Sequence, residues 1–376
     1  MSTRQKLLQR EDAGDFQGIS PSEMAQQKSP GTWSKGFNHY HTHFRFSKKE
    51  RISARELLED LKKLEARFVF CAGDHGDMRG DNFWGMNIRE FADYRDECLA
   101  VNDSGGMVLV PAPEIHLRFP PFISRQEHHA CVPIVHHLPE LGQPEFRAIA
   151  ASNTKDVQGF IREMHQHRVS LPLNHPYLSF NSAFNGPNPL NVSCLYDMDY
   201  FEILTIDHPD FFDKDFAVYL KFLENPRTKM ACCAGVDGIY PDNRLSREKR
   251  LIPSTYLNVE GHLNLSSVLD AWNERRSYAA LGNIHFETIR PVPSRNVIKT
   301  SRKPSIHFSA VSPDEDMGKW EIHRNGKMIH QQAQVGQRRL EVDFVDDDAA
   351  PGENKYTIHV EAGNSHLVTS PIVFEP

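Results

Sequence analysis

The sequence has no long apolar run and no apolar leader. No window approaches the roughly 18 consecutive apolar residues that a transmembrane helix needs. The first residues, MSTRQKLLQREDAGDFQ, lack the apolar core of a signal peptide. We therefore expect a cytoplasmic protein with no membrane partner.

Paired cysteines are also missing. The six cysteines form no C-x-x-C motif, and several lie in apolar runs such as FVFCAG and KMACCAG. This distribution is typical of buried, reduced thiols and not of a disulfide framework. The adjacent Cys232 and Cys233 leave open a redox pair, which we favour less.

The chain has no excess of positive charge. It carries 43 Lys and Arg against 50 Asp and Glu, a formal net charge of −7. A nucleic acid would gain no electrostatic attraction from the chain as a whole, so we expect a small-molecule substrate and no nucleic-acid partner. A length of 376 residues predicts two domains, or one large domain plus a small one, and leaves a homo-oligomer possible.

Three regions of the chain differ in pattern. Residues 1–33 are polar and predict an N-terminal arm. Residues 34–295 alternate β-type runs with amphipathic helical patterns, which predicts an α/β barrel of parallel strands covered by helices. Residues 300–376 contain short β runs and the hairpin signal Asn325-Gly326, which predict a small C-terminal β-sandwich. Histidines in this last region alternate with apolar residues, as solvent-facing strand positions do, so we assign them no chemistry.

Histidine is abundant, and 15 of the 20 histidines precede residue 291. The stretch FNHYHTHFRFS places His39, His41 and His43 at every second position. In a strand, alternate side chains share one face, so three imidazoles would converge as metal ligands do. A solvated His-rich loop is the alternative.

Further potential ligands follow the predicted strands. Each taken alone is more typical of a helix cap or a turn. Together they form a mixed nitrogen and oxygen set suited to Zn, Mn or Fe, and a carboxylate among histidines can bridge two ions about 3.5–4 Å apart. In (β/α) barrels the chemistry lies beyond the C-terminal strand ends. The motifs are GDHGD with Asp74 and His75, PAPEIH with Glu114, EHHACVPIV with His128 and His129, NHP with His175, and AGVDG with Asp237.

The order of these motifs resembles the PHP (polymerase and histidinol phosphatase) superfamily of metallohydrolases over roughly residues 34–290. The segment STYLNVEGHLNLSSVLDAWNERRSYAALGN and the closing LVTSPIVF are similar to its CehA/McbA (carbaryl hydrolase-like) branch. The resemblance implies a distorted (β/α)7 barrel with a binuclear centre of Zn, Mn or Fe. The metal ligands that it implies are His41, His43, His75, Glu114, His129, His175 and Asp237.

Two departures from the family pattern affect this expectation. Ile239 stands where many relatives have the histidine of D-x-H, and Lys48 and Lys49 replace an acidic or histidine residue. Because both groups usually help to hold a third metal, we expect two ions and leave open an altered activity. His39 stands where relatives often carry Asp, so it is an extra ligand or supports one.

The resemblance implies a hydrolase of esters, carbamates or amides, in which metal-bound hydroxide attacks the substrate. His75 and Asp237 are the implied catalytic residues, with His75 protonating the leaving group. A PHP-type phosphoesterase is the alternative enzyme, and a noncatalytic metal- or ligand-binding module is the alternative of another class. Further pocket candidates are Asp207, His208 and His285, and arginines near predicted strand ends are Arg79, Arg118, Arg244 and Arg290.

Overall fold

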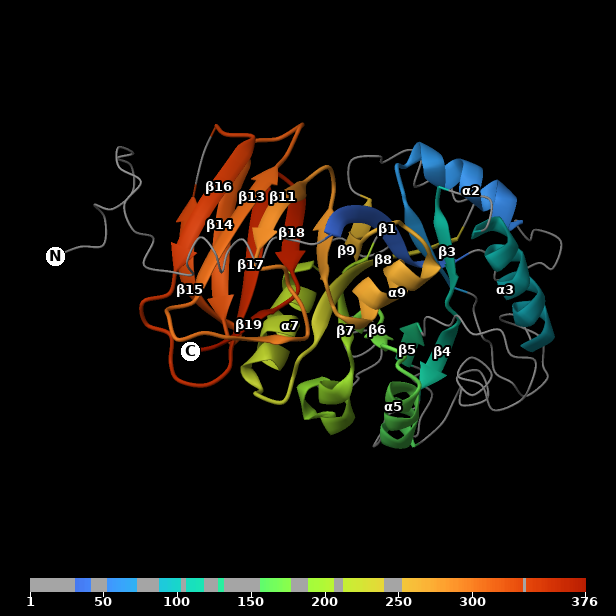
Figure 1. Cartoon of the computed structure of the whole chain (residues 1–376), viewed down its shortest axis with the longest axis horizontal. Coiled ribbons are helices and arrows are strands. Elements are labelled where there is room, and N and C mark those ends of the chain that lie inside the picture. The colour runs from blue at the N-terminus through green and yellow to red at the C-terminus, as the bar shows by residue number, and fades with distance from the viewer. Residues whose placement is uncertain are drawn as a thin grey trace.

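The computed structural model describes residues 31–41, 53–72, 88–102, 106–117, 128–131, 156–176, 189–205, 212–239, 252–333 and 336–376. Figure 1 shows helices α2 and α3 at one end of the molecule and the strands of the C-terminal region at the other. A large sheet connects the two ends.

The main sheet has 14 strands and is mixed. Six of its strands run parallel to their neighbours, in the order β3 (Val108–Pro111), β2 (Phe68–Ala72), β1 (Gly31–His41), β8 (Ala231–Ile239), β7 (Tyr200–Thr205) and β6 (Pro172–Leu173). The others are β9 (Pro253–Glu260), β10 (Ser277–Leu281), β12 (Val297–Lys299), β14 (Met317–Arg324), β15 (Lys327–Ala333), β17 (Asn354–Ala362), β18 (Ser365–Thr369) and β19 (Ile372–Glu375).

The predicted (β/α)7 barrel is wrong. The described residues form five α-helices, and their parallel strands do not close, because β3 and β6 do not pair with each other. Instead β9 pairs antiparallel with the first half of β1, and β10 continues antiparallel from β9 to β18. The sheet therefore runs without interruption into the C-terminal region. Alternating sequence patterns indicate helices and strands, but pairing direction depends on contacts distant in sequence.

Five helices correspond to the amphipathic patterns of the sequence. Two of them begin with side-chain caps: Asp156 accepts from the Gly159 N–H before α5, and Asn264 forms a capping box with Ser267 before α9. Such caps satisfy N–H groups that the first helical turn leaves without a partner. The helices are α2 (Ala54–Lys63), α3 (Ile88–Asn102), α5 (Val157–Gln166), α7 (Phe212–Glu224) and α9 (Leu265–Asn273), with 3₁₀ turns η2 (Pro189–Asn191) and η3 (Ser193–Asp197).

The C-terminal region adds a second layer of strands. A three-stranded antiparallel sheet consists of β11 (His285–Arg290), β13 (Ser305–Val311) and β16 (Arg339–Val345). Its inner face packs against β14 and β17 around Phe308, Ile322 and Tyr356, which are fully buried. The hairpin prediction at Asn325-Gly326 is confirmed: both residues have positive φ, 49° and 75°, between β14 and β15.

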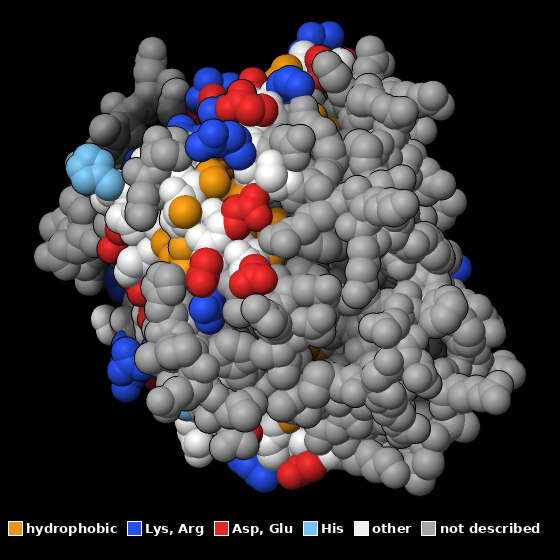
Figure 2. Space-filling model, turned by 90° about the vertical axis from the view of Figure 1, so that its right-hand side faces the viewer, with side chains coloured by type: hydrophobic (Ala, Val, Ile, Leu, Met, Phe, Trp, Pro, Cys, Tyr) orange, Lys and Arg blue, Asp and Glu red, His pale blue; other side chains and the backbone are white. Residues whose placement is uncertain are grey.

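The prediction of buried thiols outside a disulfide framework is confirmed for the five described cysteine side chains, which are buried and form no disulfide: Cys71, Cys98, Cys194, Cys232 and Cys233. None of the described helices combines the length and hydropathy needed to cross a membrane. On the face that carries α2 and α3, Lys, Arg, Asp and Glu side chains lie among small hydrophobic areas (Figure 2). One such pair is Lys62 and Glu59 of α2, at 2.9 Å.

Candidate metal centre

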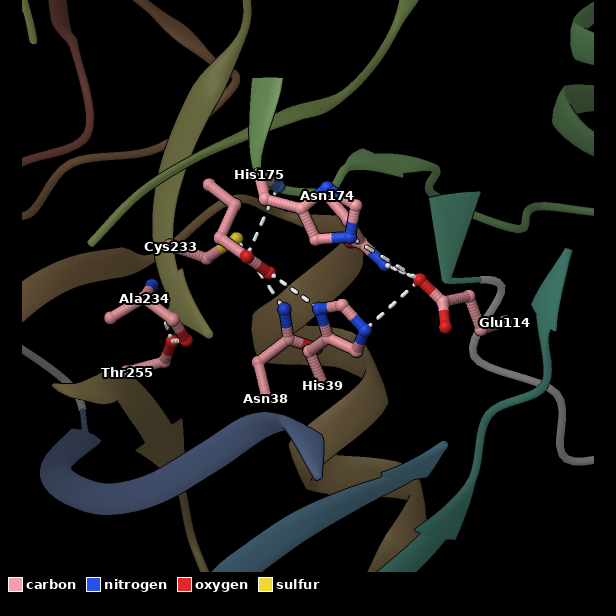
Figure 3. Close-up of polar contacts among 9 residues, drawn as sticks. Asn38, His39, Glu114, Asn174, His175, Cys233, Ala234 and Thr255 are labelled. Carbon is pink, nitrogen blue, oxygen red and sulfur yellow. Dashed lines mark hydrogen bonds and ion pairs between the residues drawn. The ribbon is translucent and has the colours of Figure 1, made fainter. Parts of the chain in front are cut away.

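Two histidines and one glutamate converge in the interior. His39 comes from β1, Glu114 opens β4 (Glu114–Leu117), and His175 follows β6. All three are buried, with 0%, 0% and 7% exposure. The Oε1 atom of Glu114 lies 3.0 Å from Nε2 of His39 and 3.6 Å from Nε2 of His175. In Figure 3 both rings and the carboxylate point toward a common position.

A β-bulge determines the position of His39. The pairing of β1 with β2 shifts between Phe37 and Tyr40, and its pairing with β8 shifts between Asn38 and Tyr40. His39 lies in this bulge with a φ of 54°. A bulge redirects side chains and interrupts the alternation of faces. The bulge interrupts, at His39, the regular strand assumed for His39, His41 and His43; the side chain of His41 and the whole of His43 lie outside the described residues.

The backbone of both histidines, His39 and His175, adopts a positive φ angle. His39 has a φ of 54° and His175 a φ of 29°, in the left-handed region that non-glycine residues seldom adopt. Such a conformation costs on the order of 1–3 kcal/mol and persists only where the surroundings enforce it. The strain at two converging histidines is characteristic of a functional site.

Glu202 of β7 connects the two histidines. Its Oε2 atom lies 3.2 Å from Nδ1 of His39, and its Oε1 atom accepts a hydrogen bond of 3.1 Å from the backbone N–H of His175. The residue is fully buried. On neighbouring β8, Gly235 provides the necessary space, because a Cβ atom there would collide with the Glu202 carboxylate. Glu202 is not among the residues predicted from the sequence; its signal there is a lone carboxylate within the apolar run YFEILTI.

The donor set fits a divalent metal ion. The three donor atoms of His39, Glu114 and His175 lie within 4.8 Å of one another. Ligands bound to one ion at about 2.0–2.2 Å are roughly 3–3.5 Å apart, near the 3.0 and 3.6 Å found here. Metal-binding histidines commonly donate their other ring N–H to a carboxylate, the position that Glu202 occupies beside His39.

Charge supports the same assignment. Two fully buried carboxylates, Glu114 and Glu202, face the single ring of His39. Buried negative charge is costly unless a cation or a proton balances it. Asn174 contributes one hydrogen bond, donated from Nδ2 to Oε1 of Glu114 at 3.3 Å, which helps to orient the carboxylate.

The structure brings together two of the predicted ligands, Glu114 and His175, and adds His39. The backbone of His41 ends β1 opposite Ile239 of β8, while the side chains of His41, His129 and Asp237 lie outside the described residues. His129 is on β5 (His128–Cys131), which pairs with β4. Entirely outside the described residues are His43, His75, Asp207, His208, Arg79, Arg118 and Arg244.

Two other candidates lie elsewhere. His285 and Arg290 are on β11, in the three-stranded sheet, where they line a pocket of about 470 Å³ together with Trp33 and Tyr278. Burial lowers the pKa of His285. Because no residue of the His39–Glu114–His175 cluster lines that pocket, His285 and Arg290 belong to a different part of the molecule.

Comparison with known families and with curated proteins finds no match. Among solved structures, a lytic polysaccharide monooxygenase from Jonesia denitrificans aligns with 16% identity and a TM-score of 0.18, over 23% of this chain and 60% of that one. An endo-beta-1,4-mannanase from Thermotoga petrophila aligns with 9% identity and a TM-score of 0.24, over 90% and 97% of the two chains. At these scores neither likeness carries an argument about fold or activity.

Proposed function

We propose that this chain is a metal-dependent hydrolase that cleaves an ester, carbamate or amide bond of a small molecule. The observation that supports this proposal is the buried convergence of His39, Glu114 and His175 with Glu202 behind them. The sequence resemblance to PHP metallohydrolases supports the same chemistry and is part of the proposal.

The residues have distinct roles in this proposal. Glu202 accepts a hydrogen bond from the Nδ1–H group of His39, which leaves the unprotonated Nε2 directed at the centre. Glu114 supplies a carboxylate oxygen between the two rings, and Asn174 orients it. A divalent ion held there would polarise the substrate oxygen and activate water for attack. Because the site is buried, its charges interact more strongly than they would in water.

A binuclear centre is the finer form of the proposal. The further ligands would come from the predicted set whose side chains the structure does not describe, with His75 as the proton donor to the leaving group. This set comprises His41, His43, His75, His129 and Asp237. A cytoplasmic location and a homo-oligomer are likewise predictions.

The test measures metal and turnover together in the full chain. Bound metal is determined by mass spectrometry, and hydrolysis of p-nitrophenyl acetate and p-nitrophenyl phosphate is followed with Zn, Mn or Fe. We expect hydrolysis of the acetate ester that is lost in Glu114→Gln and retained in Glu353→Gln. Glu353 makes the matched control because its half-exposed carboxylate pairs with Lys229 at 3.2 Å.

Each other outcome contradicts a part of the proposal. Turnover of the phosphate ester alone would identify a phosphoesterase. Metal binding without turnover of either ester would favour a noncatalytic module. Undiminished turnover in Glu114→Gln would remove the assigned centre altogether.

A further inference from the structure

A second group of histidines and carboxylates lies on the C-terminal strands. His359 and Glu361 are two positions apart on β17, and His366 of β18 lies directly opposite Glu361. On the other side of β17, Glu321 of β14 is opposite His359. Directly opposed and alternate residues of antiparallel strands project from the same face, so these four side chains share one face of the sheet.

Helix α7 covers this face. The Phe212 ring lies 4.2 Å from that of His366, and the Phe216 ring lies 4.9 Å from that of His359, measured between centroids. His323 and His359 are only 5% and 3% exposed. The expectation that the C-terminal histidines face solvent is therefore wrong for these two residues. The alternating pattern identifies a polar face, but it cannot show that a distant amphipathic helix packs on it.

The arrangement of the ring nitrogens is that of metal ligands. Nε2 of His359 lies 3.2 Å from Nδ1 of His366, and an oxygen of Glu361 completes a group of donors within 4.8 Å of one another. Two nitrogens bound to one zinc ion at about 2.0–2.1 Å in a tetrahedron are roughly 3.3 Å apart. The other nitrogen of His359 lies 3.3 Å from Oε2 of Glu321, a carboxylate placed to orient the ring.

The charges around this group favour a cation. Lys319 lies 2.9 Å from Glu321 and 3.8 Å from Glu361, and the carboxylate of Asp213 on α7 also acts electrostatically on this ammonium. Three carboxylates and one ammonium leave two negative charges, which a divalent ion balances.

We propose that His359, Glu361 and His366 form a second divalent-metal site, suited to Zn²⁺, with Glu321 orienting His359. Two imidazoles and a carboxylate are a ligand set that zinc accepts. The ion would link β17 to β18 beneath α7. This site shares no residue with the His39 centre, so it does not depend on the proposed hydrolase activity.

The test counts zinc ions in the full-length protein. The chain is stripped with a chelator, loaded with Zn²⁺, desalted and measured by mass spectrometry, and its affinity is determined against a competing chelator. We expect His366→Ala to bind one zinc ion fewer than the unaltered chain. Glu361→Gln should bind that ion at least 10-fold more weakly, because even the loss of a residue that only orients a metal ligand weakens binding about 10-fold or more. Glu341→Gln, an exposed carboxylate on β16, is the matched control and should change neither.

Separate variants distinguish this site from the first. Glu114→Gln should keep the C-terminal ion, and combining it with His366→Ala should remove that ion as well. Equal zinc content and affinity in the unaltered chain, His366→Ala and Glu361→Gln would overturn the proposal and identify the 3.2 Å contact as a hydrogen bond between two histidines. Far-UV circular dichroism checks folding, and the half-exposed Glu361 gives a result even where His366→Ala does not fold.

Discussion

The described residues contain two histidine–carboxylate clusters that differ in how they are built. The first takes His39, Glu114, His175 and Glu202 from four elements that are far apart in sequence, whereas the second takes its donors from one hairpin, β17 and β18. In the first cluster, His39 and His175 have strained backbones; the second follows a regular antiparallel register. The first cluster therefore forms only when elements distant in sequence pack together, whereas the pairing of two adjacent strands is sufficient to bring the donors of the second cluster together.

The largest expected effect is a difference in esterase activity between variants of the first cluster and variants of the second. Glu114→Ala should lower kcat/KM for p-nitrophenyl acetate by about 10³-fold or more, because metal and carboxylate together contribute several kcal/mol to transition-state stabilisation. Glu361→Ala, the corresponding change in the second cluster, should stay within about twofold of the unaltered chain, an effect well below 1 kcal/mol. Equal losses in the two variants would contradict the division of roles.

The next prediction compares the two orienting carboxylates. Glu202→Gln should weaken metal binding at the first cluster by about 10–100-fold, since an amide supports the His39 ring less well than a carboxylate. Glu321→Gln should weaken zinc binding at the second cluster toward the lower end of that range, because the Glu321 side chain is 11% exposed, compared with 0% for Glu202. Titration against a chromophoric chelator measures both, and an unchanged affinity in Glu202→Gln would exclude its orienting role.

A third prediction concerns the stability of variants in which a methyl group is added at a glycine near each cluster. In Gly235→Ala the new methyl group would meet the Glu202 carboxylate, so we expect a loss of about 1–3 kcal/mol in the free energy of unfolding. Gly318→Ala on β14 is the matched control. There the nearest atom to a Cβ is the backbone oxygen of Glu361 at 3.7 Å, an ordinary contact, so the change should be within about 0.5 kcal/mol. Urea unfolding measures both.

The last prediction is a pH dependence of stability that arises from Lys355, whose hydrogen bonds connect β17 to the segment after α7. Lys355 of β17 donates hydrogen bonds from Nζ to the carbonyl oxygens of Asn225, at 2.7 Å, and Thr228, at 3.1 Å, just after α7. Burial lowers its pKa to about 8 from an ordinary 10.5. Between these values an unfolded Lys355 binds more protons than a folded one, so the contribution of Lys355 to stability should rise as the pH increases from 8 to 10.5. Buried thiols with a raised pKa, such as those of Cys194 and Cys232, contribute in the opposite direction.

Thermal unfolding across that pH range tests the Lys355 assignment. The midpoint of the unaltered chain minus that of Lys355→Met should increase by a few degrees from pH 8 to pH 10.5, at roughly 1–2 °C per kcal/mol for a chain of 376 residues. The variant lacks this contribution because the titrating group is gone. The same pH dependence in both proteins would show that Lys355 does not contribute to it.

Local sequence signals predicted the local parts of the structure. Amphipathic periodicity indicated the five described helices, and the position of Glu114 and His175 after apolar runs indicated two residues that the structure brings into one buried group. These inferences succeed because helix faces, caps and strand ends depend on nearby residues.

Features set by distant contacts could not be predicted in the same way. The bulge at His39 exists only against β2 and β8, and the pairing of β9 with β1 replaces the expected barrel closure. Glu202 is a lone charged residue in an apolar strand, and its role depends on contacts with His39 and His175, which are distant in sequence. His359 looks solvent-facing until α7 packs over it.

The pairing of β10 with β18 joins the N-terminal and C-terminal regions of the chain into one continuous sheet, although their sequence patterns predict two separate domains. Tyr278–Leu281 and His366–Thr369 form backbone hydrogen bonds between the two halves, and the Ser370 hydroxyl accepts one from the Cys232 N–H at 3.1 Å. Separating the halves would expose the buried strands β10 and β18 on both sides of the cut. Cleavage near residue 300 should therefore release no stable fragment, and denaturant should unfold both clusters in one cooperative transition.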